Sequence, residues 1–262
     1  MYKGYNAQDK TRAWVGSGGI LGSFLDKDDK PVGGYFNFGH LSSLSIAIST
    51  EVIKFKDMTY GTLADARSKV ISQSAEVTIN MKNGSPEMSA LQLNGNVFQD
   101  PAMTGQIEVV KAYKGRSIVL DGVIDEVTSI TIEDSTVELV EGAEHDYIVS
   151  DSSIYFTDHS QIVDGDSLRV VYNKSAVSRI EALVKSGISL RLVFDGRNLG
   201  EDDSPVKVTL YKVALTPTTA RQLLSSDWGD FEIKGTLELS KAAVRSGPGQ
   251  SPLYKEEHVV PA

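Results

Sequence analysis

Residues able to perform acid–base, nucleophilic or metal chemistry are few and scattered in this chain. None of the 262 residues is a cysteine, which excludes thiolate catalysis, disulfides and cysteine-ligated metals. The four histidines lie far apart, without the HxH or HxxxH spacing of a zinc site. His145 beside Asp146, and Asp158 beside His159, fit turns better than a catalytic base with its orienting carboxylate. Paired carboxylates for glycoside hydrolysis need only proximity in space, so the sequence leaves that chemistry open.

Two short segments have compositions that invite a ligand-binding interpretation. Residues 16–19, Gly-Ser-Gly-Gly, lack the Lys-Ser/Thr end of a phosphate loop and lead into a strand-like run instead of a helix. We interpret them as glycines that pack against a close neighbour. Residues 26–30 are acidic like a calcium loop but lack its central glycine and distal glutamate, which favours a charged turn. We therefore expect no catalytic residue, no cofactor and no metal ion, and a protein that is not an enzyme.

Composition places the chain among ordinary soluble globular proteins, with 40% hydrophobic and 23% charged residues. There is no run of eighteen apolar residues, so a membrane span is not expected. The first ten residues lack the apolar centre of a secretory signal, which predicts a protein made and kept in a cytoplasm.

Period-two alternation of apolar and polar residues predicts an all-β fold with one or two short helices. Pro86, preceded by the capping residue Ser85, predicts a short helix, whereas residues 176–184 fit either a helix or an extended linker. Loops are expected at 55–68 and 195–205, and a flexible arm at 247–262. The predicted strands outside the central part of the chain are 13–24, 44–54, 69–82, 188–194, 206–214 and 231–240.

The central part of the chain differs from the rest in strand spacing and in charge. Residues 107–175 hold six short extended runs, at 107–111, 117–120, 129–140, 145–149, 153–156 and 167–173. This spacing predicts a small β-sandwich of immunoglobulin-like size, and Asp164-Gly165 predicts a hairpin turn within it. From 108 to 175 there are 14 acidic and 5 basic residues, so this stretch carries the whole formal charge of −9. Such a module repels nucleic acid.

The predicted organisation is therefore a larger β domain interrupted by a smaller one. Residues 1–106 and 176–246 form the two parts of the larger domain, 107–175 form the insert, and 247–262 form the C-terminal arm.

Several local phrases occur in an order that covers most of the chain. They are the glycine-rich run at 13–24, residues 33–41, the alternating run at 44–54, the helix start at 85–88, and residues 145–149, 163–172, 208–217 and 227–235. In this order the chain resembles the tail tube proteins of tailed bacteriophages. The resemblance implies a tail-tube β-sandwich or barrel with a small inserted β-sandwich domain.

The resemblance also implies a virion protein that self-assembles into stacked, hexameric rings. These rings would form the tube through which viral DNA leaves the capsid without specific binding. Expected partners are copies of the chain itself and other tail proteins, namely tape measure, terminator and baseplate or distal tail components. The expected location is the virion tail, assembled in the host cytoplasm, and the bulky insert favours the non-contractile, siphovirus type. Another ring-forming tail component is a related alternative.

The resemblance assigns a ring-stacking role to the loop at 55–68. Its contact candidates are Phe55, Asp57, Met58, Tyr60 and Arg67. The alternative from another functional class is a non-enzymatic adhesin or carbohydrate-binding β-sandwich protein, which would use exposed aromatic residues to bind a glycan.

Overall fold

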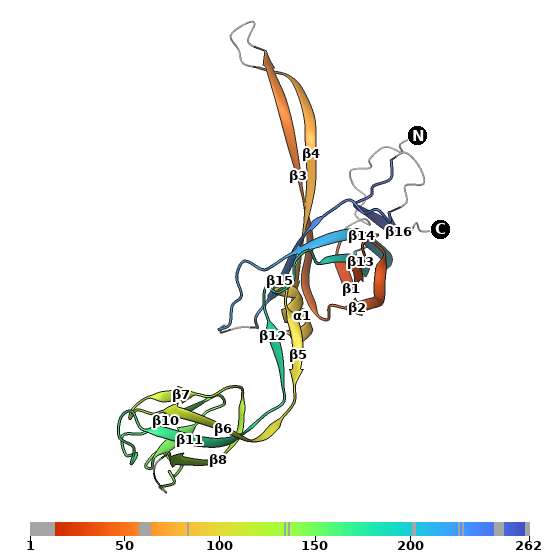
Figure 1. Cartoon of the computed structure of the whole chain (residues 1–262). Helices are drawn as coiled ribbons and strands as arrows, with labels where there is room; N and C mark the ends of the chain where they lie inside the picture. The colour runs from red at the N-terminus through yellow and green to blue at the C-terminus, as the bar shows by residue number, and fades with distance from the viewer. Residues whose placement is uncertain are drawn as a thin grey trace. The chain divides into compact units, whose positions relative to one another are not determined.

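The computed structural model describes residues 14–57, 64–82, 84–133, 135, 137–200, 203–224, 226, 228–243 and 249–259. In these residues sixteen strands and one short helix occur, so the prediction of an all-β fold is confirmed. The chain divides into two compact units (Figure 1). Unit 1 comprises Met1–Asn96 and Ile180–Ala262, and unit 2 comprises Val97–Arg179.

Unit 1 is built on one eight-stranded antiparallel sheet. Its strands are β1 Gly16–Leu25, β2 Pro31–Asn37, β3 Leu41–Asp57, β4 Ala64–Met81, β13 Ser189–Asn198, β14 Ser204–Thr216, β15 Phe231–Leu237 and β16 Tyr254–His258. The order across the sheet is β2-β1-β13-β14-β15-β4-β3, and β16 also pairs with β14. One edge of β14 pairs with β13, while the other is shared by β16, along Val206–Leu210, and β15, along Val213–Thr216.

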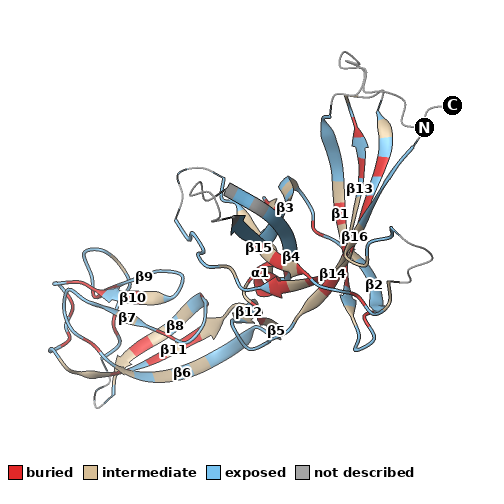
Figure 2. Cartoon of the chain, turned by 90° about the horizontal axis from the view of Figure 1, so that it is seen from above, coloured by how far each residue is buried: buried red, intermediate tan, exposed pale blue. Residues whose placement is uncertain are grey.

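The core of unit 1 follows from the alternation of apolar residues along these strands. In β4, Val77, Ile79 and Met81 are buried at every second position, as the two-residue period of a strand requires. Leu190 and Leu192 of β13 alternate in the same way and belong to the same cluster. Figure 2 shows buried positions alternating with exposed ones along strands of the sheet. The sequence pattern thus decides which face of each strand is turned inward.

Two glycines face each other across β1 and β13, where Gly18 is the register partner of Gly196. A Cβ on Gly18 would lie 2.5 Å from the Asp195 carbonyl oxygen, and a Cβ on Gly196 would lie 2.3 Å from the Phe194 ring. The absence of both Cβ atoms lets the Phe194 ring lie over the backbone. The interpretation of this glycine-rich run as a close-packing segment is confirmed for Gly18.

Helix α1, Pro86–Gln92, begins as predicted at Ser85, whose hydroxyl accepts a hydrogen bond from the Met88 backbone N–H at 3.3 Å. The chain then leaves unit 1 through β5 Asn96–Asp100 and returns through β12 Val177–Glu181, and these two strands pair. Of the two alternatives for residues 176–184, the extended one is therefore observed. A Cβ on Gly95 would lie 2.5 Å from the Glu181 carbonyl oxygen, so the close approach at this point needs glycine.

Unit 2 contains two three-stranded antiparallel sheets with the orders β7-β10-β9 and β6-β11-β8. The strands are β6 Met103–Lys111, β7 Ser117–Val119, β8 Ile124–Ile132, β9 Tyr147–Val149, β10 Ser153–Phe156 and β11 Ser167–Lys174. Ile154 and Phe156 of one sheet share a buried cluster with Leu168, Val170 and Tyr172 of the other. The two sheets thus form a small sandwich with its own core.

Two predictions within unit 2 are wrong in detail. The run at 129–140 is not one strand, because β8 ends at Ile132 and the chain folds back so that Glu138 bridges to Thr131. The polar stretch after Ile132 supplies the turn that the alternating pattern concealed. A turn does occur at Gly165, with φ of 95°, but the strands on either side of it lie in different sheets, so it does not close a hairpin.

Two predicted irregular segments of unit 1 are strand in part. The loop expected at 195–205 is shortened because Asn198 pairs with Ser204, which extends β13 and β14 toward each other. The C-terminal stretch is not wholly a flexible arm, because β16 pairs with β14. In both cases the open edge of a neighbouring strand imposes an extended structure that the polar local sequence does not specify.

A buried carboxylate ties the turn between β1 and β2 to the end of the sheet. Asp29 is only 5% exposed and accepts a 2.8 Å hydrogen bond from the Lys241 backbone N–H. Its other oxygen lies 3.3 Å from the Lys212 ammonium, which also lies 3.1 Å from Glu238. The Lys241 hydrogen bond, together with Lys212, lowers the pKa of Asp29 in spite of its burial. Residues 26–30 are thus a charged turn held by a lysine.

We expect Asp29→Asn to lower the free energy of unfolding at neutral pH by about 1–3 kcal/mol, since a charge-assisted contact is lost. Because the folded-state pKa lies below the ordinary value, the contribution is present above that value and is lost as the pH falls through the folded pKa. Denaturant unfolding at several pH values measures the difference, which should vanish in acid. Asp28→Asn, in the exposed part of the same turn, is the matched control. Equal effects of the two variants at neutral pH would contradict the role of Asp29.

Candidate assembly surface

The distal half of the β3–β4 hairpin extends beyond the rest of the sheet of unit 1 (Figure 1). β15 pairs with β4 only from Met81 to Glu76, and among the described residues no other strand pairs with the hairpin beyond this point. Every residue whose burial is described in 47–57 and 64–74 is exposed. We call these two stretches the arm.

Apolar side chains occur on both faces of the arm. On β3, Leu44 and Ile46 pack on the core, and Ile48 and Val52 lie on the same face of the strand. Ile53 and Phe55 lie on the opposite face. The exposed fractions are 62% for Ile48, 59% for Ile53 and 67% for Phe55. A ribbon that is apolar on both faces in water indicates contact with other surfaces.

A β-bulge lies in the middle of the arm. Glu51 pairs with Ser72 and Val52 with Val70, so Ile71 is the extra residue on β4. The bulge increases the local twist of the ribbon.

The structure places the five predicted contact residues as follows. Phe55 is exposed and pairs with Arg67, which is also exposed, so these two lie together on the arm. Asp57 is the last residue of β3 and pairs with Ala64. Met58 and Tyr60 lie outside the described residues. The loop expected at 55–68 is therefore too long, because ladder pairing continues to 57 on one strand and resumes at 64 on the other.

Sequence reasoning missed the apolar residues farther down the arm. They are Ile48, Val52, Ile53, Val70 and Ile71, with exposed fractions from 39% to 62%. The sequence indicates these residues by a change of pattern. Large apolar residues occupy one face of the predicted strand from 44 to 48, but both faces from 52 to 55. A solvated hairpin would keep at least one face free of large apolar residues.

One ion pair crosses the arm near its far end. Lys54 lies 2.7 Å from Asp65, and both side chains are substantially exposed. The hydrogen bond to Asp65 raises the pKa of Lys54, which therefore stays charged at neutral pH. An exposed pair of this kind adds little stability and fixes the register of the ribbon at most.

The two ends of the large sheet are formed by β2 and β3, each of which pairs with a single neighbour in the described part of the chain. β2 pairs with β1 at Pro31, Val32, Phe36 and Asn37, while Gly33 and Gly34 adopt positive φ between them. β3 pairs only with β4. Free strand edges are templates for pairing with another chain.

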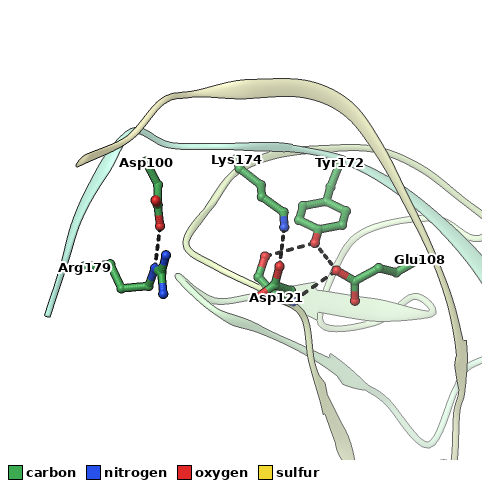
Figure 3. Close-up of polar contacts among 6 residues, drawn as sticks. All are labelled: Asp100, Glu108, Asp121, Tyr172, Lys174 and Arg179. Atoms are coloured by element: carbon green, nitrogen blue, oxygen red, sulfur yellow. Dashed lines mark hydrogen bonds and ion pairs between the residues drawn. The ribbon is translucent and has the colours of Figure 1, made fainter. Parts of the chain in front are cut away.

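A polar cluster is found in unit 2 near the entry of the β5–β12 ribbon (Figure 3). The buried Tyr172 hydroxyl bonds to the Glu108 carboxylate and, at 3.0 Å, to the Asp121 carbonyl oxygen. Glu108 also accepts the Asp121 backbone N–H at 3.2 Å, and Lys174 lies 2.7 Å from the Asp121 carboxylate. In the ribbon itself Arg179 lies 2.7 Å from Asp100.

The electrostatics of this cluster indicate a structural role. Burial, and then the hydrogen bond to Glu108, raise the pKa of Tyr172 well above its ordinary value, so the phenol stays protonated and donates. The hydrogen bond from Lys174 lowers the pKa of Asp121. These groups join β6, β11 and the turn before β8 at one end of the sandwich.

In the two histidine–aspartate pairs noted in the sequence, Asp146 binds backbone groups and His159 is exposed. Both carboxylate oxygens of Asp146 accept backbone N–H groups, from Val140 at 2.9 Å and from Gln161 at 2.7 Å. His159 is exposed and lies 3.9 Å from Glu144. Among the residues described, no group of three or more His, Asp or Glu side chains could hold a metal ion. No helix in that part of the chain has the length and apolar character needed to cross a membrane.

Comparison with known proteins gives one family. The family model described as "Protein of unknown function UCP028589" matches residues 13–253, which include both units almost completely. No curated protein matches the chain.

We expect Tyr172→Phe to lower the free energy of unfolding by about 1–3 kcal/mol, because Glu108 and the Asp121 carbonyl lose a buried donor. Tyr155→Phe is the matched control, since Tyr155 is 37% exposed. Calorimetric unfolding of both variants measures the difference. An unchanged stability of Tyr172→Phe would show that the cluster does not fasten this end of the sandwich.

Proposed function

The chain belongs to the UCP028589 family of proteins of unknown function, and we propose that it is a subunit that self-assembles into stacked rings, forming the tail tube of a bacteriophage. The observation that carries the proposal is the arm, a two-stranded ribbon with exposed apolar residues on both faces. An isolated two-stranded hairpin is marginally stable in water. A second copy of the chain that covers both faces would stabilise it.

The energies are of the size that stacking of multi-subunit rings requires. Full burial of one Ile, Val or Phe side chain is worth about 1.5–3 kcal/mol, so the six half-exposed apolar residues of an arm supply on the order of 5–10 kcal/mol. The loss of translational and rotational freedom on association costs about 4–15 kcal/mol. One arm alone is thus weak, whereas several arms that engage together from one ring make stacking strong.

Ring formation is supported by the two free ends of the large sheet. If β3 of one copy pairs with β2 of the next, the contact is heterologous and closes into a ring when the rotation per subunit allows it. Closure removes both exposed edges, which a monomer would leave open to aggregation. The exposed Val32 and Tyr35 of β2 would be covered in such a contact.

Charge supports a position of the insert away from the lumen. Residues 108–175 carry the entire net charge of −9, and the rest of the chain is balanced with 21 acidic and 21 basic residues. A projecting acidic module on the outside keeps tubes apart and soluble. In this proposal DNA passes through the lumen without specific binding, and the tape measure, terminator and distal tail proteins meet the ends of the tube.

We expect the purified chain to form striated tubes of uniform width in negative-stain electron microscopy. Replacing residues 49–74 by Asn-Gly, between the partners Ile48 and Ala75, removes five of the six exposed apolar residues and should leave folded subunits or single rings that do not elongate. Tubes from the shortened protein would contradict the stacking role of the arm. Dispersed monomers from the intact chain at high concentration would favour the adhesin alternative, which a glycan array would then test.

A deletion of the insert is the matched control for loss of chain length. Met103 and Lys174 are register partners, so the two ends of the insert are adjacent. We expect replacement of residues 104–173 by Asn-Gly to preserve folding and tube formation and to reduce the outer diameter of the tubes. Loss of tubes from a folded protein would show that the insert takes part in assembly.

A further inference from the structure

A second exposed apolar surface lies on the segment between β14 and β15. Leu223, Leu224 and Trp228 are 81%, 89% and 85% exposed, the highest values among the large apolar residues described. The segment is nonetheless tied to the body of unit 1 near its start, where the Thr218 backbone N–H donates to the Gln92 carbonyl oxygen at 3.1 Å. We call the three apolar residues the base patch.

The other end of the segment is fixed to the start of the β3–β4 ladder. Lys82, directly after β4, donates to the Trp228 carbonyl oxygen at 3.2 Å and lies 2.9 Å from the Asp230 carboxylate. Ser42, the second residue of β3, donates to Asp230 at 3.1 Å. The base patch is therefore fixed to the open end of the ladder, where β3 begins and β4 ends, whereas Phe55 lies near the tip.

We propose that the base patch is the surface on which the arm tip of a second copy docks. This inference rests on the proposed function and names the receiving surface for the arm. The tip and the patch are at opposite ends of the same ladder, so they do not meet within one chain. In this contact one copy is displaced relative to the next along the β3–β4 ladder. Ile53 and Phe55 of the first copy then meet Leu223, Leu224 and Trp228 of the second.

The chemistry of the two surfaces agrees with this assignment. Both surfaces are apolar. The segment that carries the base patch is hydrogen-bonded to unit 1 at Thr218 and Trp228, whereas the arm is a two-stranded ribbon that the contact would stabilise. A Trp side chain buries about 150–250 Å². With two leucines the base patch thus supplies roughly half of the ~800 Å² that one partner contributes to a stable interface, so a single contact is weak and several must form together between two rings.

The contact is also of the type that produces a tube. Tip and patch are different surfaces, so their contact is heterologous, and a translation along the ladder does not close it. Each added layer presents a new set of base patches or tips for the following one. The free β2 and β3 edges then make lateral contacts, and the tip and base patch make axial ones.

A cysteine pair tests the contact directly, because the native chain has no cysteine. In assembled protein, the double variant F55C/L224C treated with oxidant or a short bis-maleimide should give a ladder of covalent dimers, trimers and higher species in denaturing electrophoresis. F55C/V163C, with its second cysteine on an exposed residue of the insert, should give dimers at most.

The outcomes separate the inference from the proposed function. Tubes in the microscope without a covalent ladder would overturn the base patch as the docking surface and leave the tube proposal intact. Single particles of the wild-type chain at high concentration would overturn both. As a second variant, L223S/L224S should fold like the wild type, because both leucines are exposed, and should lose elongation. Normal tubes from L223S/L224S would likewise overturn the inference.

Discussion

The feature on which the rest depends is the difference in length between β15 and the strands that it supports. β15 has seven residues and β4 has eighteen, so β15 covers β4 only from Met81 to Glu76. Beyond that point no described strand pairs with the hairpin as a third strand, and the large apolar residues of the arm are 39–67% exposed. This exposure is why the arm is the strongest indication of assembly.

β14 explains how unit 1 remains one body although its sheet bifurcates. Its thirteen residues pair with β13 on one edge, and with β16 and then β15 on the other. Val206, Leu210 and Val213 of this strand all belong to the common core. The buried contact of Asp29 with Lys212 adds a polar link from the β1–β2 turn to the same strand. β14, in the sheet from which the arm projects, is thus paired along both of its edges.

The sequence pattern predicted those features that depend only on residues close together in the chain. The helix start at Ser85 and Pro86, the buried face of β4 and the six-run character of the insert follow from capping, period-two alternation and turn residues. The strands at 195–198 and 254–258 were not predictable in this way, because the open edges of β1 and β14 impose them. The candidate site was found only in part: Phe55 and Arg67 lie on the arm, but the bulge at Ile71 and the base patch depend on tertiary pairing.

The insert is joined to unit 1 through its own departing and returning strands. These strands pair as a ribbon, and backbone hydrogen bonds join Leu93 to Leu183 and Asn94 to Lys185 where the ribbon meets unit 1. The buried clusters of the two units share no residue, so each unit packs around a core of its own. In the proposed tube, a module with its own core can vary in sequence, whereas residues that contact other copies must keep fitting copies of themselves.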